Sequence, residues 1–452
     1  MKKLSTILLL TTIVAGTACH KSDDAVEPGS GGSADVRGVI NSDQHWTKDK
    51  TYRIRGYVYV SGNATLTIDP GTKIVSNRDS AGVLVIYKGA KIMAQGTSSE
   101  PIIFTSAESA PQPGDFGGVV LVGQATGNTN HKTLEGGVDA PYKDFGGTND
   151  ADNSGVLKYV RIEWAGKAVN PGDEVNGLSL YAVGSGTTID YIQVTRGLDD
   201  AFEFFGGAVN CKHLIAYNCA DDDFDLDDGY HGKIQFAVSI KNPTFTDTKS
   251  GGDLSNNFEV DNVNGSNGLP YSTTPTTFPT LSNFTAIGPN NATGTSADYG
   301  YGMRWRRGCK FILANSIVMG GQKAGLSIEQ DSTGSYYKQG ISKFYNSFLH
   351  AVTSPFRVAS VAATYLDSTQ LATITLTTNA SVLYPDAATI KLNDPFNNTV
   401  PNLKPQSGSP ALTKTAKFDV GTLSESFFDK VTYVGAFDAS TDWTASWTVW
   451  NK

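Results

Sequence analysis

Apolar and polar residues alternate over much of the chain, in short runs that glycine, proline and aspartate interrupt. The first runs span residues 52–60, 64–74, 83–86, 90–97 and 101–105. Alternation with a period of two places every second side chain on the same face, which is typical of β-strands and not of helices. The interrupting residues are those that favour turns. This pattern predicts an all-β protein made of many short strands.

A second series of apolar runs recurs farther along the chain and indicates a repeating coil. Its members span residues 159–162, 191–194, 213–216, 236–239, 284–287, 312–315 and 344–347. Each run would supply one face of one coil, with alternate side chains directed into a shared core. Residues 124–155 and 242–282 interrupt the series, and we expect them to be loop insertions on one side, where solenoids commonly bind ligands.

Two adjacent segments of 22 residues, 188–209 and 210–231, align with each other without gaps. A third, partial copy at residues 256–262 follows residues 222–228 after an offset of 34. A period of this length is typical of a solenoid, in which each coil stacks on the previous one. The sequence therefore predicts one continuous solenoid body over residues 36–452 instead of several globular domains.

The aligned copies bring acidic residues into register. Phe224 and Leu226 point inward in the alternating pattern, so the aspartates that flank them point outward. Stacked coils place equivalent residues roughly 4.8 Å apart. Two carboxylates at ~5 Å repel by about 1 kcal/mol in water-like surroundings, and by several times more where they are partly buried. The stacked positions are Glu203, Asp225 and Glu259 in one column, Asp227 and Asp261 in a second, Asp199 over Asp221, and Asp200 over Asp222 and Asn256.

Such an accumulation of oxygen ligands on rigid turns suits calcium, which takes about six to eight oxygens. We therefore predict a structural calcium ion on this face. The alternative is a solvated acidic face without a metal, because repulsion of this size is tolerable at a surface. The predicted ligands are Asp199, Asp200, Glu203, Asp221, Asp222, Asp223, Asp225, Asp227, Glu259 and Asp261.

The overall charge of the chain narrows the classes of partner. The chain has 36 basic and 44 acidic residues, which give a net charge of -8. Nucleic acids and acidic membranes attract basic patches, so this balance argues against both as partners of the body. Cations, neutral glycans and basic partners remain compatible with it.

The first residues have the pattern of a processing signal. Lys2 and Lys3 precede an apolar stretch over residues 4–14, and small residues lead to Cys19. This resembles the signal of bacterial lipoproteins, and implies removal of residues 1–18 and lipidation of Cys19. An ordinary secretory signal is the alternative. No other apolar run is long enough to cross a bilayer, so the lipid would be the only membrane anchor.

The segment after the cysteine also carries a resemblance. Residues 20–24 resemble the charged tag that directs lipoproteins of Bacteroidota to the outer face of the outer membrane. Residues 25–35 are rich in glycine and serine, and we expect residues 19–35 to form a flexible tether. The resemblance implies a lipid-anchored protein of the outer membrane that faces the cell exterior.

Cysteines and tryptophans are expected to have structural roles. Cys211, Cys219 and Cys309 are odd in number, so they cannot form a complete set of disulfides. We expect them to be small buried hydrophobic residues. The last coil is expected to be closed by a group of tryptophans, with sugar stacking as the alternative: Trp443, Trp447 and Trp450.

A basic strand lies near the acidic columns in the expected fold. Arg304 and Arg306 share one face of it, and Trp305 lies on the other. We predict that the arginines form ion pairs with the acidic columns. A slot for an anionic ligand is the alternative.

The opening strands, with the turns between them, closely resemble the first coils of right-handed parallel β-helices of the pectate-lyase-like superfamily. The body as a whole, from residues 117–120 through the Asp-rich coils to the tryptophan-containing end, resembles a group of bacterial β-helix surface lipoproteins. These resemblances imply a right-handed parallel β-helix at the cell surface. They do not imply a particular activity.

The superfamily resemblance also implies an enzymatic alternative. Pectate lyases hold calcium with acidic side chains and use a cation such as arginine as the base, and polygalacturonases use aspartates on neighbouring coils followed by Gly-His-Gly. Here a tyrosine interrupts that motif at residues 229–232, and no Arg-x-Lys pair follows in the matching place. Structural roles would explain the same residues. The candidate catalytic residues are Arg161, Arg196, Asp200, Asp222 and His231.

The sequence thus predicts a lipid-anchored, surface-facing β-helix whose calcium-stabilised acidic coils bind an extracellular ligand such as a glycan. An outer-membrane importer is the expected protein partner, because of the location that the resemblance implies. The alternative function is a calcium-dependent polysaccharide lyase or glycoside hydrolase.

Overall fold

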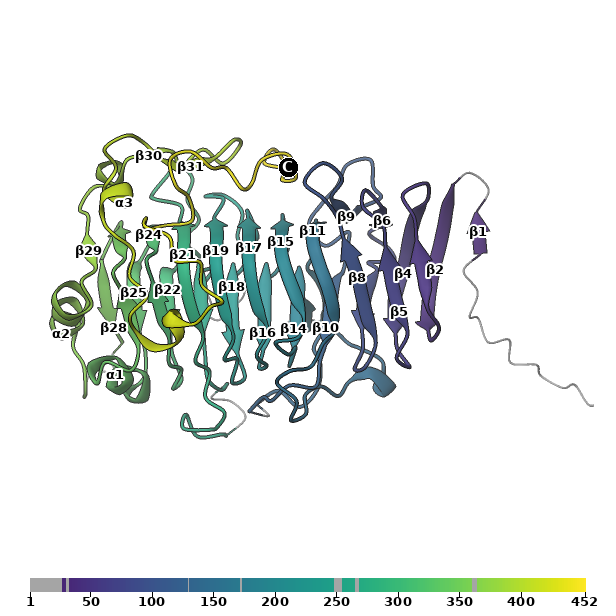
Figure 1. Ribbon diagram of the computed structural model, residues 1–452, viewed down its shortest axis with the longest axis horizontal. Helices are drawn as coiled ribbons and strands as arrows, with labels where there is room; N and C mark the ends of the chain where they lie inside the picture. Colours follow the sequence, from purple (N-terminus) through teal and green to yellow (C-terminus); the bar gives the residue numbers. More distant parts are fainter. Residues whose placement is uncertain are drawn as a thin grey trace, which may run out of the picture.

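The computed structural model describes residues 27–29, 32–128, 130–170, 173–247, 254–264, 268–359 and 364–452. The chain winds into an elongated solenoid whose coils follow one another along the long axis (Figure 1). Within the described residues, one sheet of parallel pairings joins 27 strands, and only β1 enters it antiparallel. The predicted all-β parallel β-helix is confirmed. The predicted signal segment 1–18 and Cys19 lie outside the described residues.

One side of the solenoid is a continuous parallel sheet that carries the acidic strands, and we call it the first face. Its neighbours pair in register, so that Phe202 lies beside Phe224, and Phe224 beside Phe258. The strands are β7 (Val83–Ile86), β10 (Gly118–Val122), β14 (Leu178–Tyr181), β16 (Phe202–Phe205), β18 (Phe224–Asp227), β20 (Phe258–Val260), β22 (Tyr301–Trp305), β25 (Ala324–Ile328) and β28 (Phe356–Val358).

Long strands with a bend in the middle form the two other faces. They are β11 (Gly155–Glu163), β15 (Thr188–Thr195), β17 (Asn210–Tyr217), β19 (Lys233–Ile240) and β21 (Thr280–Ile287). In later coils the halves separate into β23 (Ile312–Ala314) and β24 (Ile317–Gly321), then β26 (Lys343–Tyr345) and β27 (Phe348–Ala351), and end at β29 (Val382–Leu383).

The bends are made by one stacked residue per coil with a positive φ, near the left-handed helical region. The first four runs of the second series begin at such a bend, and the run 284–287 begins directly after one. In the runs 312–315 and 344–347 the bend lies within the run. The bend residues are Tyr159, Tyr191, His213, Phe236, Asn283, Asn315 and Asn346. A change of direction at one residue cannot be read from alternation, because the side chains beyond it still alternate.

The opening coils precede these long bent strands in the chain. They contain β2 (Ser33–Ile40), β3 (Gln44–Trp46), β4 (Thr51–Val60), β5 (Thr65–Ile68), β6 (Lys73–Ser76), β8 (Lys91–Gln95) and β9 (Ile102–Ser106). The short β1 (Glu27–Gly29) pairs antiparallel with the start of β2. The body therefore begins before residue 36, and the predicted tether over residues 19–35 extends too far.

The core is a stack of large side chains along the axis. The ring centroids of Phe202 and Phe224 are 5.3 Å apart, and those of Phe224 and Phe258 are 5.5 Å apart. Trp305 continues the row and stacks on Phe311 at 3.7 Å. Burial of these rings removes large apolar surfaces from water. The cysteines are fully buried as predicted: Cys211, Cys219 and Cys309.

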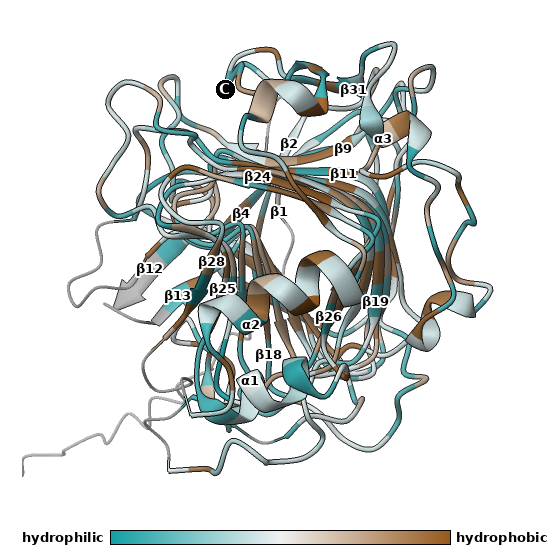
Figure 2. Ribbon diagram, turned by 90° about the vertical axis from the view of Figure 1, so that its left-hand side faces the viewer, coloured by the Kyte–Doolittle hydropathy of each residue, from teal (hydrophilic) through white to brown (hydrophobic). Residues whose placement is uncertain are grey.

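Short helices close the far end of the solenoid. Figure 2 looks along the axis from that end and shows α2 lying across the opening. Leu366 and Leu371 enter the main core there. Across the described residues, the helical segments, at the far end and elsewhere, are η1 (Ala140–Tyr142), α1 (Asp331–Lys338), α2 (Ser368–Thr373), η4 (Ile374–Thr378), η5 (Ala387–Ile390), α3 (Pro410–Thr413) and η6 (Gly421–Ser424). No helix in the described parts of the chain combines the length and apolar character that a membrane span needs.

The C-terminal segment runs back along the outside of the solenoid instead of closing it (Figure 1). The Trp447 ring packs edge-on against Tyr159 and Tyr191, and the Trp450 ring packs edge-on against Tyr217. The prediction that the tryptophans close the last coil is therefore wrong. They hold the segment against the bent strands.

The remaining strands form two hairpins outside the coils. They are β12 (Lys167–Asn170) with β13 (Asp173–Val175), and β30 (Leu392–Asp394) with β31 (Asn402–Pro405). The segment 242–282, which we predicted to be one insertion, contains β20 of the first face. It is therefore two separate loops on either side of a coil strand.

Candidate functional site

The outward side chains of the first face form a row along the axis that changes character from coil to coil. The row is apolar on the opening coils, acidic in the middle and basic toward the end. In chain order it contains Tyr59, Val85, Val120, Ser179, Glu203, Asp225, Glu259, Arg304, Ser327 and Arg357. The predicted column of Glu203, Asp225 and Glu259 is therefore confirmed as a stack.

The insertion after β10 covers the apolar part of this row. Its Leu134 and Tyr142 pack with Tyr59 and Tyr181 in one hydrophobic cluster. The Tyr142 ring stacks on Tyr59 at 4.0 Å, and the backbone N–H of Asp139 donates to the Tyr59 hydroxyl at 2.9 Å. The cover ends where the row becomes acidic, so the insertion forms one wall of an open region.

The open region is a cleft of about 220 Å³. His131 and Glu135 of the insertion line it, as do Glu174 and Asn176 beside the β12–β13 hairpin. All predicted metal ligands except Asp223 line it as well: Asp199, Asp200, Glu203, Asp221, Asp222, Asp225, Asp227, Glu259 and Asp261.

The turns before the acidic strands carry a ladder of side chains that links successive coils. The Asp200 carboxylate accepts a hydrogen bond from the Asp222 N–H at 2.8 Å, and the Asp222 carboxylate accepts one from the Asn256 N–H. Asn176 accepts from the Asp200 N–H in the same way, at 3.2 Å. The predicted stacking of Asp200 on Asp222 and Asn256 is confirmed, and it gives both aspartates a structural role.

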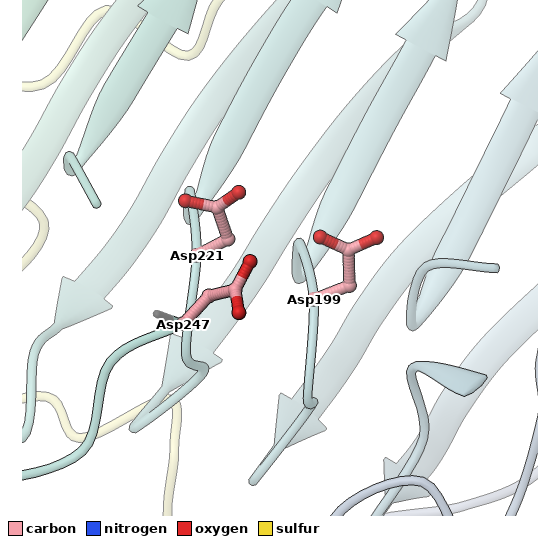
Figure 3. Close-up of side chains that lie close together, drawn as sticks. All are labelled: Asp199, Asp221 and Asp247. Carbon is pink, nitrogen blue, oxygen red and sulfur yellow. The ribbon is translucent and has the colours of Figure 1, made fainter. Parts of the chain in front are cut away.

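Carboxylate oxygens converge in four groups among the described residues, and in each group one oxygen per residue lies within 4.8 Å of the others. Figure 3 shows the group of Asp199, Asp221 and Asp247. Asp247 was not predicted because it lies in the loop after β19, outside the repeat. The other groups are Asp200 with Glu203 and Asp225, Asp200 with Asp221 and Asp222, and Asp222 with Asp225 and Glu259.

Burial makes several of these carboxylates hard to ionise. Burial raises the pKa of Glu203 and Asp225 well above the usual range, and the charges of neighbouring acids raise it further. The same two causes, with Asp228 as the neighbour, raise the pKa of Asp227 to about 6. Oδ1 of Asp225 is buried and receives no hydrogen bond from the described residues. A cation among these groups would favour their ionised forms.

The basic end of the cleft is neutralised by the protein itself. Arg304 Nη1 donates to Glu259 at 2.9 Å, and Arg306 Nε donates to Asp261 at 2.7 Å. Arg306 also pairs with Glu259, and Arg307 pairs with Asp261. The predicted ion pairs between the basic strand and the acidic columns are confirmed.

Asp223 does not face the cleft, contrary to our prediction. Its fully buried carboxylate lies 3.0 Å from Lys241 Nζ and accepts a hydrogen bond from the Ser239 hydroxyl. Burial lowers the pKa of Lys241, but the Asp223 charge outweighs it and the pKa is raised. Burial also raises the pKa of Asp223, against the effect of Lys241. The alternating pattern fails here because Asp223 precedes β18 and belongs to the turn.

Only two of the five candidate catalytic residues line the cleft, namely Asp200 and Asp222. Arg161 and Arg196 lie on other faces, where both donate hydrogen bonds to backbone carbonyls of the C-terminal segment. His231 contacts the insertion through Asp150 and does not line the cleft. The structure therefore does not bring the predicted bases to the carboxylates.

His131 is a cleft residue that the sequence did not reveal. Its Nδ1 lies 2.9 Å from the Asp228 carboxylate and its Nε2 lies 3.5 Å from Glu135. Burial lowers the pKa of His131, but the hydrogen bond and charge of Asp228 outweigh this effect and raise it to about 9. A charged His131 thus ties the insertion to the end of β18. It lies outside the repeats, so no periodic signal marks it.

The coils match a known family of β-helix domains. A family model for the pectate-lyase-like β-helix domain matches residues 38–388. The chain belongs to this family. The crystal structure of the pectate lyase Pel9A is similar over 83% of this chain and 88% of its own, with 13% sequence identity and a TM-score of 0.44. No curated protein sequence matches the chain.

Membership in the pectate-lyase-like family agrees with the predicted right-handed parallel β-helix. The matched residues include the first face from β7 to β28 and the whole acidic cleft. A pectate-lyase-like β-helix suggests a polysaccharide-related function. The family match does not distinguish binding from cleavage.

Proposed function

We propose that the acidic cleft holds a calcium ion and that the protein uses this site to bind an extracellular glycan. The observation that carries the proposal is the convergence of carboxylate oxygens from successive coils to within 4.8 Å of one another. Asp225 belongs to two of these groups, and its buried Oδ1 accepts no hydrogen bond from the described residues. Hard oxygen ligands on rigid turns are what calcium prefers.

The surroundings of the cation site suit a glycan. Calcium takes about six to eight oxygens, so hydroxyl or carboxylate oxygens of a ligand can complete its coordination. Asn176, Asn264 and Arg307 line the same cleft and carry groups that donate hydrogen bonds to such oxygens. The polysaccharide-related fold supports the same class of ligand.

Metal analysis combined with thermal unfolding tests the calcium site. The purified protein should contain calcium, and a chelator should lower its melting temperature by about 5 °C, as expected for loss of a bound ligand. Asp225→Asn should abolish both effects, whereas Asp79→Asn, at an exposed aspartate on an opening coil, should leave them unchanged. A melting temperature that responds to neither calcium nor chelator would contradict the proposal.

The proposed location is based on the N-terminal residues, which resemble a lipoprotein signal. We propose that lipidated Cys19 anchors the protein in the outer membrane with the β-helix facing the exterior, beside an importer that takes up the bound glycan. Labelling of intact cells with a membrane-impermeant reagent tests the orientation, and Cys19→Ala should release the protein from membranes. Purification of the anchored protein without any accompanying envelope protein would argue against the importer.

A calcium-dependent polysaccharide lyase or glycoside hydrolase is the second candidate. The observation that favours it is that Arg306 and Arg307 line the same cleft as Asp200 and Asp222. Incubation with uronate-containing and neutral polysaccharides, with and without chelator, separates the two functions. Release of products at a useful rate would establish the enzyme, whereas retention of intact polysaccharide would establish the binding protein.

A further inference from the structure

A second cleft lies on a different side of the solenoid, between the C-terminal segment and the β30–β31 hairpin. Its volume is about 270 Å³, slightly more than that of the acidic cleft. One wall contains Val400, Asn402 and Lys404, and the other contains Asp442 and Trp450. None of these residues belongs to the first face, so the two clefts are separate.

The walls of this second cleft are fixed from below by one buried tyrosine. The Tyr217 hydroxyl lies between the backbone carbonyls of Asn398 and Trp450, which lead into opposite walls, and donates its one proton to either of them. The C-terminal segment is also held by Gln193, whose amide donates to the Val449 carbonyl at 2.8 Å. The cleft is therefore preformed by the β-helix and does not depend on a ligand for its shape.

The lining combines apolar surface with charged and amide groups. Trp450 is only partly buried, and Val400 at the rim has 62% of its surface exposed. The Asp442 carboxylate bonds within the described chain only to Thr444, through one oxygen, at 2.6 and 3.0 Å. The Lys404 ammonium and the Asn402 amide add hydrogen-bond donors on the facing wall. Preformed clefts with apolar walls and a few convergent polar groups are typical ligand sites.

We infer that this cleft is a second saccharide-binding site, which takes a neutral sugar unit and needs no cation. A pyranose ring presents C–H groups on its faces and hydroxyls around its edge. The Trp450 ring can pack against the C–H groups, and the polar groups of Asp442, Asn402 and Lys404 can form hydrogen bonds with the hydroxyls. A single carboxylate beside an ammonium does not form a calcium site, since calcium requires several oxygen ligands. The inference rests on the proposed function for its ligand class, but not for its position.

Two sites on different sides of one rigid body would act together on a long glycan. Binding at one site raises the effective concentration of the same chain at the other, provided that the glycan can reach both. The anchored protein would thereby retain a polysaccharide more firmly than either site alone. The second site would also retain neutral regions that the calcium site does not bind.

Affinity gel electrophoresis of the full chain in soluble neutral polysaccharides tests the site, with a β-glucan, a galactomannan, a xyloglucan and an arabinan as probes and excess chelator throughout. At least one probe should retard the protein despite the chelator. Trp450→Ala and Lys404→Met should each weaken this retardation at least tenfold, and Asp79→Asn should not. Lys404→Met serves as the second variant in case loss of the Trp450 ring loosens the segment, and a melting curve identifies that case.

Three results would overturn the inference: no retardation by any probe in chelator, retardation that both variants leave intact, or a cleft occupied by a co-purifying peptide. The proposed calcium site fails separately. If added calcium changes nothing but chelator-resistant retardation depends on Trp450 and Lys404, the calcium site is refuted and the second site stands. If calcium-dependent binding is seen but these two variants have no effect, the second site is refuted alone.

Discussion

The two ends of the acidic columns differ in how their charge is balanced. Toward the later coils, Glu259 and Asp261 meet three arginines of β22 and of the turn that follows it. Asp225 lies one coil earlier and Glu203 two coils earlier. These two acids stack on each other and lie near further acids, and burial raises the pKa of both. The strands at both ends pair in parallel register, so it is the side chains that decide where the protein supplies cations.

This difference separates structural charge from charge that is available to a ligand. Glu259 and Asp261 were predicted as calcium ligands, and both already pair with arginines. Burial and the charge of Asp227 still raise the pKa of Asp261, and Glu259 also converges with Asp222 and Asp225. Asp225 has no arginine partner among the described residues and is shared by two carboxylate groups. A calcium ion at Asp225 would give the earlier coils the balance that the arginines give the later ones.

The largest expected effect comes from removing a cation at the balanced end. Arg306→Met leaves Glu259 and Asp261 buried with less positive charge, and loss of one partner from a buried pair costs about 3–5 kcal/mol. The free energy of unfolding from denaturant titration measures this cost. Arg37→Met, at an arginine whose side chain is 66% exposed, is the control. A loss below about 1 kcal/mol would show that the pairs contribute little.

Removing a carboxylate from the earlier coils should change the free energy of unfolding by an amount that depends on calcium. With calcium at about 100 times its dissociation constant, the wild type gains about 2.7 kcal/mol, which Asp225→Asn should lose. Without calcium, the same substitution should stabilise the protein slightly, because it removes a buried acid whose ionisation is opposed by burial and by neighbouring acids. Denaturant titrations with calcium and with chelator measure both effects. Destabilisation of equal size in both conditions would instead indicate a purely structural role.

The unfolding free energy of the calcium-free protein should depend on pH through the buried acids of the earlier coils. The pKa of Asp227 rises from 3.8 in the unfolded chain to about 6 in the folded protein. Its contribution to stability is therefore fully present below pH 3.8 and is lost as the pH rises through 6, by about 3 kcal/mol. Asp227→Asn should flatten the stability profile between pH 4 and 7. A profile that the substitution leaves unchanged would place the titration elsewhere.

A smaller effect is expected at the wall of the cleft. The pKa of His131 rises from 6.5 to about 9, so its contribution is fully present below pH 6.5 and is lost as the pH rises through 9. Partial exposure limits this contribution to about 1 kcal/mol. His131→Gln should remove the corresponding slope in the unfolding free energy, and hydrogen exchange of the insertion should show whether its cover loosens.

Much of the solenoid could be predicted because stacking repeats a local pattern. The match between residues 188–209 and 210–231 predicted the register of Phe202 on Phe224 and of Glu203 on Asp225, and both are observed. Inward and outward positions followed from the same alternation. These relations depend only on the spacing of coils, which the sequence period contains.

Features that depend on contacts between distant segments could not be predicted in this way. Asp223 pairs with Lys241 because the turn bends inward, and no alternation extends into a turn. The course of the C-terminal segment depends on Tyr217 and Gln193, which offer no periodic signal for it. His131 reaches Asp228 only because a long insertion folds back. The sequence therefore predicted the acidic strands at the base of the cleft, but not the insertion with His131 that forms its wall.

The gapless match of two successive 22-residue coils has a consequence for how such a surface can evolve. A tandem duplication of residues 210–231 would add one coil (one rung of the acidic ladder) with its own inward rings and outward carboxylates. The coils on either side would still pair in the same register. The number of acidic rungs can therefore change in whole steps. Ligand length can be matched by gene duplication, without redesign of a core.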